Sequence, residues 1–145
     1  MIRKLTENTI VVGEGGSSNT TIISGRNCLI IVDTSLFPEK ALKIRKFSQE
    51  IFGKPISLVI NTHYHPDHTF GNAAFEDVNI LSSKLTKEFM EQMDINYIEK
   101  IWGKEGAKKY HVSLPNSTFE EKLSLSECGV KMSFAILVVI LQIPR

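Results

Sequence analysis

The feature that most constrains this chain is a cluster of metal-binding residue types placed directly after an apolar run. Ile56 to Ile60 reads as a continuous, buried strand. The segment His63-Tyr64-His65-Pro66-Asp67-His68 follows within three residues. Histidine and aspartate are costly in a core unless they are paired or coordinated. In α/β architectures the loop at the carboxyl end of such a strand is a common place for a functional site.

The rest of the chain predicts strands and helices in a mixed order. Short β-branched runs separated by glycine-rich turns indicate antiparallel hairpins over 9–12, 20–23 and 28–32. A helix is expected to begin at Pro38 and end at Gly53, with an apolar stripe along one side. A strand at 78–81 and a helix of roughly twenty residues after Ser82 or Ser83 follow. These elements predict an α/β (α+β) fold. The helix stripe of Leu85, Phe89, Met93, Tyr97 and Ile101 is expected in the core, or exposed if the chain is incomplete.

Length and charge narrow the class of protein. The 145 residues amount to one domain or a piece of one, and 42% of them are hydrophobic, enough to build a core. The net charge of +1 is spread along the chain, which argues against a nucleic-acid partner. The N-terminus lacks the apolar stretch of a signal peptide, so a cytoplasmic location is the default expectation. The apolar run 132–143 is too short for a membrane span, which needs about 20 residues.

The two cysteines give no positive signal. Cys28 and Cys128 lie far apart and neither belongs to a C-x-x-C motif. Cys28 sits in a β-branched run and is expected to be a small buried apolar residue. No disulfide is predicted.

The chemistry of the H-x-H-x-D-H segment favours a divalent metal. In an extended loop, residues two apart project to the same side, so His63 and His65 can reach one ion. Asp67 and His68 lie further round the turn and can face a second ion. Zinc accepts nitrogen and oxygen ligands of this kind and generates hydroxide at neutral pH. The expected reaction is hydrolysis of a carbonyl, thioester or phosphoester bond. Three loop histidines with no metal role are the less favoured interpretation.

The segment 61–72 closely resembles the signature of the metallo-β-lactamase-fold hydrolases, and the likeness extends from about Thr9 to Leu81. This resemblance implies an αβ/βα sandwich acting on a small-molecule ester, thioester, amide or lactam-like substrate. It implies two zinc ions, with iron or manganese as alternatives. His63 and His65 would bind the first ion, and Asp67 and His68 the second. Asp67 would also orient the attacking water or pass a proton, and Asp33 would steady the motif loop.

The same resemblance implies three further ligands downstream, and none is recognisable. We expect a single incomplete domain over 1–145, with 136–145 as an out-of-frame tail. Permitted codons for the last residues, read one base earlier, spell Leu-Gly-Gly-His-Thr-Pro-Asp-Ser-Ser, which is similar to the family's third-histidine turn. Weak activity or none is therefore expected, because two imidazoles alone make a poor zinc site. The alternatives are a non-catalytic remnant and a sulfur dioxygenase-like relative with one iron. A nuclease is disfavoured by the charge.

Overall fold

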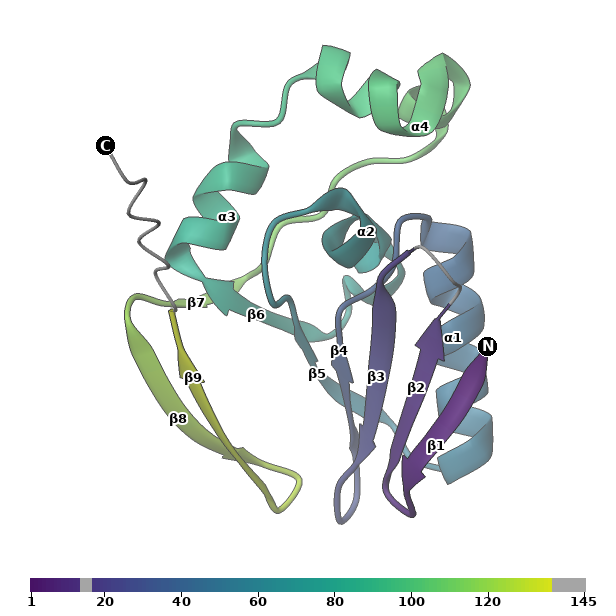
Figure 1. The fold of residues 1–145 in the computed structure, drawn as a ribbon, viewed down its shortest axis with the longest axis vertical. Helices are drawn as coiled ribbons and strands as arrows, with labels where there is room; N and C mark the ends of the chain where they lie inside the picture. The colour runs from purple at the N-terminus through teal and green to yellow at the C-terminus, as the bar shows by residue number, and fades with distance from the viewer. Residues whose placement is uncertain (14–16, 137–145) are drawn as a thin grey trace, which may run out of the picture.

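In a computed structural model the described residues, 1–13 and 17–136, form a seven-stranded mixed sheet and a two-stranded sheet (Figure 1). The strands of the large sheet lie in sequence order: β1 (Ile2–Thr6), β2 (Thr9–Gly13), β3 (Asn19–Ser24), β4 (Leu29–Val32), β5 (Ile56–Ile60), β6 (Asn79–Ser83) and β7 (Ser117–Phe119). Strands β1 to β4 pair antiparallel, and β4 to β7 pair parallel. The small sheet is the hairpin of β8 (Lys122–Glu127) and β9 (Val130–Ala135). The α/β expectation is confirmed.

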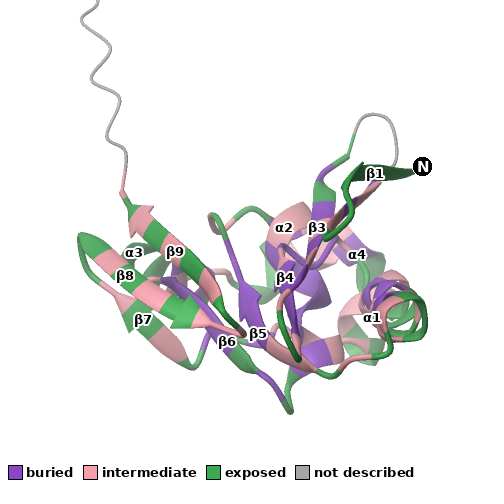
Figure 2. Ribbon diagram, turned by 90° about the horizontal axis from the view of Figure 1, so that it is seen from below, coloured by how far each residue is buried: buried purple, intermediate pink, exposed green. Residues whose placement is uncertain are grey.

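Alternation along the central strands gives the large sheet two apolar faces. Ile31 and Val59 face a core shared with α1 (Pro38–Phe52) and the 3-10 helix η1 (Phe70–Phe75). Their neighbours Ile30 and Leu58 face the opposite core, against which the β8–β9 hairpin packs. Figure 2 shows the buried central strands between α1 on one side and the hairpin on the other. The sheet is therefore covered on both faces, as a parallel sheet requires.

Most predicted boundaries are confirmed, but the first strand was missed. The helix α1 begins at Pro38 and ends at Gly53, whose φ of 62° is the left-handed conformation that favours glycine. Its predicted apolar stripe is only partly buried: Ile44 lies in the core, whereas Leu42 and Ile51 are exposed. Strand β1 is exposed along its whole length. It therefore shows no apolar alternation for sequence analysis to detect.

The predicted twenty-residue helix after β6 is wrong, since two helices stand in its place: α3 (Lys84–Glu91) and α4 (Ile95–Lys109). Asp94 caps the second helix by accepting a hydrogen bond from the Tyr97 amide at 2.8 Å. The break interrupts the expected stripe, and Leu85, Phe89 and Tyr97 are exposed. The buried residue of α4 is Trp102, to which the sequence assigned no role.

The prediction about cysteine is also wrong. Cys28 and Cys128 form a disulfide with a Cα–Cα distance of 5.5 Å, and both residues are half-buried. The hairpin brings together two residues 100 positions apart. Sequence spacing carries no signal of that contact. No helix among the described residues is long and apolar enough to cross a membrane. The proposed out-of-frame tail lies, apart from Ile136, outside the described residues.

Candidate metal site

The motif occupies the loop that leaves β5 at the carboxyl edge of the parallel strands. His63, Tyr64 and His65 lie in this loop, and α2 (Pro66–Thr69) begins directly after it. Pro66 stands at the first helical position, where its missing N–H is not needed. Asp67 and His68 follow within the single turn of α2. The predicted ligands therefore lie on both sides of the point where the loop becomes a helix: His63 and His65 before it, Asp67 and His68 after it.

The structure brings the three imidazoles of the motif together. The ring of His63 lies 4.6 Å from that of His65 and 4.0 Å from that of His68, centroid to centroid. The Nε2 atom of His68 lies 3.6 Å from Oδ2 of Asp67. Burial, together with the neighbouring histidines, lowers the pKa of His63. A neutral imidazole is the form that binds a metal.

These donors fit a divalent metal in kind, because imidazole nitrogen and carboxylate oxygen are the ligands that zinc, iron and manganese accept. They do not form a closed cluster. Among the described residues, no three donor atoms of the motif lie within 4.8 Å of one another. The group that meets this distance comprises Cys28, Glu127 and Cys128, and its two sulfurs are joined in the disulfide. His111, the remaining histidine, contacts Glu76 and not the motif.

Asp33 connects the end of β4 to the motif loop. Its carboxylate accepts hydrogen bonds from the Thr62 amide at 2.8 Å and the Thr62 hydroxyl at 2.7 Å. Its Oδ2 atom lies 2.6 Å from Nδ1 of His68. This bond to Asp33 raises the pKa of His68, against the opposing effect of burial. Because the carboxylate can only accept, Nδ1 of His68 carries the proton toward it, and Nε2 is left to face the motif.

A buried amide pair closes the motif loop, and sequence analysis missed it. Asn61 precedes the motif and Asn72 follows it, and each donates to the other's side-chain oxygen, at 3.0 and 2.8 Å. The Thr34 hydroxyl donates to Oδ1 of Asn72 at 2.9 Å, and the Thr34 amide donates to the carbonyl of His68 at 2.9 Å. The hydroxyl of Ser18, before β3, donates to the backbone carbonyl of Asp67. In the sequence, this pair is visible as one asparagine before the motif and one after it.

An apolar cleft of about 700 Å³ opens beside the motif. It lies between the large sheet, α3 and the β8–β9 hairpin, and His63 and Tyr64 stand at its wall. Among the described residues, those that line it include no Lys, Arg, Asp or Glu. Its main apolar side chains are Ile23, Val32, Ile60, Phe119, Met132 and Phe134.

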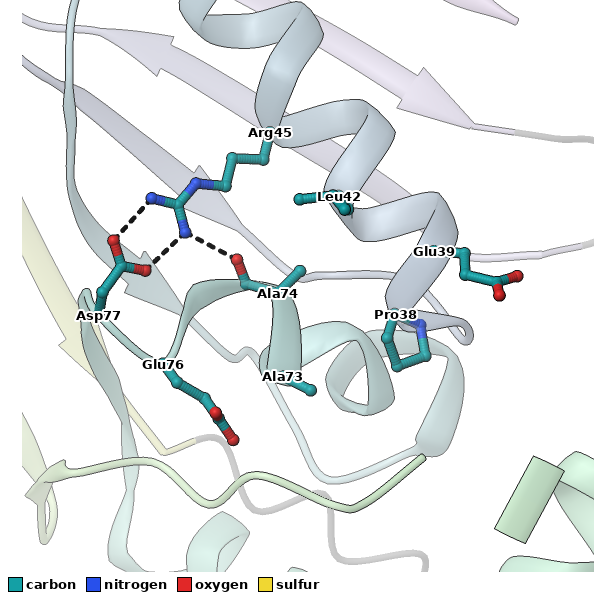
Figure 3. A pocket seen from close by; sticks show the side chains of 8 residues that line it. All are labelled: Pro38, Glu39, Leu42, Arg45, Ala73, Ala74, Glu76 and Asp77. Atoms are coloured by element: carbon teal, nitrogen blue, oxygen red, sulfur yellow. Dashed lines mark hydrogen bonds and ion pairs between the residues drawn. The ribbon is translucent and has the colours of Figure 1, made fainter. Parts of the chain in front are cut away.

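A second hollow lies beside α1 and η1 and does not reach the motif. Figure 3 shows the side chain of Arg45 crossing from α1 toward Asp77, with Leu42 on the same helix. The charged groups of this hollow are engaged by their neighbours: Arg45 bonds Asp77, and Glu39 pairs with Lys109. The cleft beside His63 is therefore the concave surface associated with the predicted ligands.

Comparison with known proteins identifies the family. A sequence profile of the metallo-beta-lactamase superfamily matches residues 13–117, and the chain belongs to that superfamily. A metallo-beta-lactamase from Pontibacter korlensis has the same fold, with a TM-score of 0.69 over 92% of this chain and 58% of that one, at 17% identity.

Two curated relatives are sulfatases. The alkyl/aryl-sulfatase BDS1 of Saccharomyces cerevisiae is 39% identical over 69 residues, which is 47% of this chain and 11% of the relative. The linear primary-alkylsulfatase of a Pseudomonas species is 43% identical over 47 residues, or 32% of this chain and 9% of the relative. The chain thus spans about a tenth of the length of the curated relatives it matches.

Proposed function

We propose that this chain carries the first half of a metal-dependent hydrolase site. The observation that carries the proposal is the gathering of three imidazoles at the carboxyl end of β5, with His68 oriented by Asp33. In this assignment His63 and His65 hold one divalent ion, and Asp67 and His68 hold a second. Zinc is the first candidate, with iron and manganese as alternatives. The ion would supply Lewis acidity and a hydroxide nucleophile at neutral pH.

The residues of the chain have separate tasks in this proposal. Asp67 has a carboxylate that reaches His68, while its backbone carbonyl is held by Ser18. That arrangement fixes the position of the main chain and leaves the carboxylate to orient water or accept a proton. Asp33 is a positioning residue, since it acts through His68 and the backbone of Thr62. We further propose that the described residues belong to a single domain of this fold.

The substrate we propose is a small-molecule ester with an apolar part. The sulfatase relatives are named for the hydrolysis of alkyl or aryl sulfates. Within the described part of the chain, no Lys, Arg, Asp or Glu lines the cleft beside His63. An alkyl sulfate, an aryl sulfate and a thioester are the first substrates to compare. The open arrangement of the donors favours weak metal retention and low activity in this chain, so a non-catalytic remnant is the second candidate.

Metal binding tests this proposal without relying on turnover. Metal-free protein is titrated with Zn²⁺ and with Co²⁺, and the bound metal is followed by calorimetry and by the cobalt absorption spectrum. His63→Ala and His68→Ala should each weaken binding by at least about tenfold. His111→Ala is the matched control and should bind as the wild type does, because His111 contacts Glu76. Equal affinity in the wild type and the His63 variant would overturn the assignment.

A further inference from the structure

A disulfide lies away from the H-x-H-x-D-H motif and is a second reactive group among the described residues. The Cys28–Cys128 disulfide joins the turn between β3 and β4 to the turn between β8 and β9. We propose that these cysteines are a thiol–disulfide exchange site, and that their oxidation state sets how firmly the β8–β9 hairpin is held over the cleft. The proposal does not depend on metal binding or on hydrolysis.

The two turns are in contact beyond the disulfide itself. The Arg26 amide donates to the Cys128 carbonyl at 2.6 Å. Gly25 lies so close to Cys128 that a Cβ atom at position 25 would overlap the cysteine side chain. Lys54 fixes the other side of the first turn by donating to the Ser24 hydroxyl and the Gly25 carbonyl, both at 2.8 Å. These contacts would keep the two sulfurs near each other after reduction, so the bond can form again.

In this proposal, a thiol approaches the bond through a surface hollow beside Cys128. A hollow of about 340 Å³ lies against Cys128, and it is lined by Asn8, Ser24, Gly25, Arg26, Gly129 and Val130. Arg26 places a cation at this hollow, while the carboxylate of Glu127 lies 4.0 Å from Sγ of Cys128. The Ser57 hydroxyl lies 3.1 Å from the same sulfur. After reduction that hydroxyl can donate to a Cys128 thiolate, which stabilises the charged form.

The reductant in this exchange is one low-molecular-weight dithiol or two molecules of a monothiol such as glutathione. The thiolate of the first molecule attacks Sγ of Cys128, the S–S bond breaks, and Cys28 leaves as a thiolate that takes up a proton. A second thiolate attacks the sulfur of the bound reductant. Cys128 then leaves as a thiolate beside Ser57, and the reductant departs as its disulfide. The reductant gives up two electrons to the protein. The protein takes up one proton at Cys28, and a second when the Cys128 thiolate is protonated.

The structural consequence falls on the cleft beside His63. The hairpin contributes Met132, Ser133 and Phe134 to the cleft wall. It is held to the large sheet by the apolar side chains of its inner face, by the turn contacts and by the disulfide. Removing the disulfide takes away the covalent attachment at the hairpin turn. Reduction should therefore increase local opening of residues 122–135 more than that of the central strands.

Hydrogen exchange followed by mass spectrometry tests this proposal in glutathione buffers of stepped ratio, with free thiols counted in the same samples. Two thiols should appear together, and exchange over 122–135 should become roughly tenfold faster as they do. Exchange over 56–60 should stay nearly constant. The Cys28→Ser and Cys128→Ser variants should exchange as the reduced protein does and should not respond to glutathione.

Two results would overturn the proposal. One is a wild type whose two thiols remain free in oxidised glutathione. The other is complete oxidation and reduction with no change in exchange over 122–135. If a cysteine variant fails to fold, these two wild-type measurements still decide the proposal. Ser57→Ala, which keeps both cysteines, tests the role of the hydroxyl. Loss of the hydroxyl contact should slow reduction, and an unchanged rate would contradict the role given to Ser57.

Discussion

The most informative perturbation is the replacement of Asp33 by asparagine, which keeps the shape of the side chain and removes its charge. Three hydrogen bonds end on the carboxylate, two from Thr62 and one from His68. Asparagine can still accept the bond from the Thr62 amide, but its NH₂ group cannot accept from a second donor. Asp33 is 4% exposed, so the contacts to its carboxylate are screened little by water.

The size of the stability loss depends on which of the released donors can form a hydrogen bond with water instead. Thr62 is exposed and can bond to solvent, so its lost contact costs little. The bond to His68 is partly buried, and a hydrogen bond to a charged group contributes about 1.5–3 kcal/mol. We expect Asp33→Asn to lower the free energy of unfolding by about 2 kcal/mol. Asp33→Ala should cost about 1 kcal/mol more, because position 33 has a φ of 62° that alanine tolerates poorly.

Urea unfolding of metal-free protein at pH 7 measures this loss, with the fluorescence of the single tryptophan, Trp102, as the signal. Asp94→Asn is the matched control. Asp94 caps α4 from an exposed position, and asparagine caps helices equally well, so a change under about 0.5 kcal/mol is expected. The reasoning is refuted if Asp33→Asn is no more destabilising than this control. In the Asp33→Asn variant, the affinity for Zn²⁺ should also fall about 10–100-fold.

Three further substitutions test the packing and the charges around the site. Phe70→Ala removes a side chain with 0% exposure that packs against Trp102, and it should cost about 3–5 kcal/mol, measured by urea unfolding. Gly71→Ala should cost more than about 1 kcal/mol and lower the melting temperature, because the added Cβ overlaps the backbone carbonyl of Thr34. Arg45→Met should change the acid dependence of stability. The hydrogen bond from Arg45 lowers the pKa of Asp77, so the ion pair stabilises the fold above the ordinary carboxylate pKa of 3.8, and this contribution is lost as pH falls through the depressed value. Asp77 is exposed, so the effect should stay below about 1 kcal/mol near neutral pH. The difference in melting temperature between the two proteins should be smaller at pH 3 than at pH 7.

Local patterns in the sequence were sufficient for much of the fold. Short apolar and β-branched runs at β3, β4, β5 and β6 are a property of neighbouring residues, and they predicted these strands. Pro38 and Gly53 marked the ends of α1 because each has a backbone preference of its own. The motif was visible for the same reason, since His63, His65 and His68 are local in sequence. The family resemblance drew on this same segment.

Contacts between distant parts of the chain were decided by the tertiary structure. The His68 ring is held by a carboxylate 35 positions away, and Asn61 pairs with Asn72 only because the motif loop folds back on itself. The helix break before α4 falls where Asp94 caps the second helix, within a stretch whose apolar residues recur every four positions.

The disulfide shows the limit of sequence reasoning most clearly. Its two cysteines are 100 positions apart, and they meet because the β8–β9 hairpin packs across the second face of the sheet. Residue type and local pattern are encoded in the sequence, and they predicted the central strands, the first helix and the H-x-H-x-D-H motif. Which side chains then meet is set by how the layers stack, because each such contact depends on every element between its two partners.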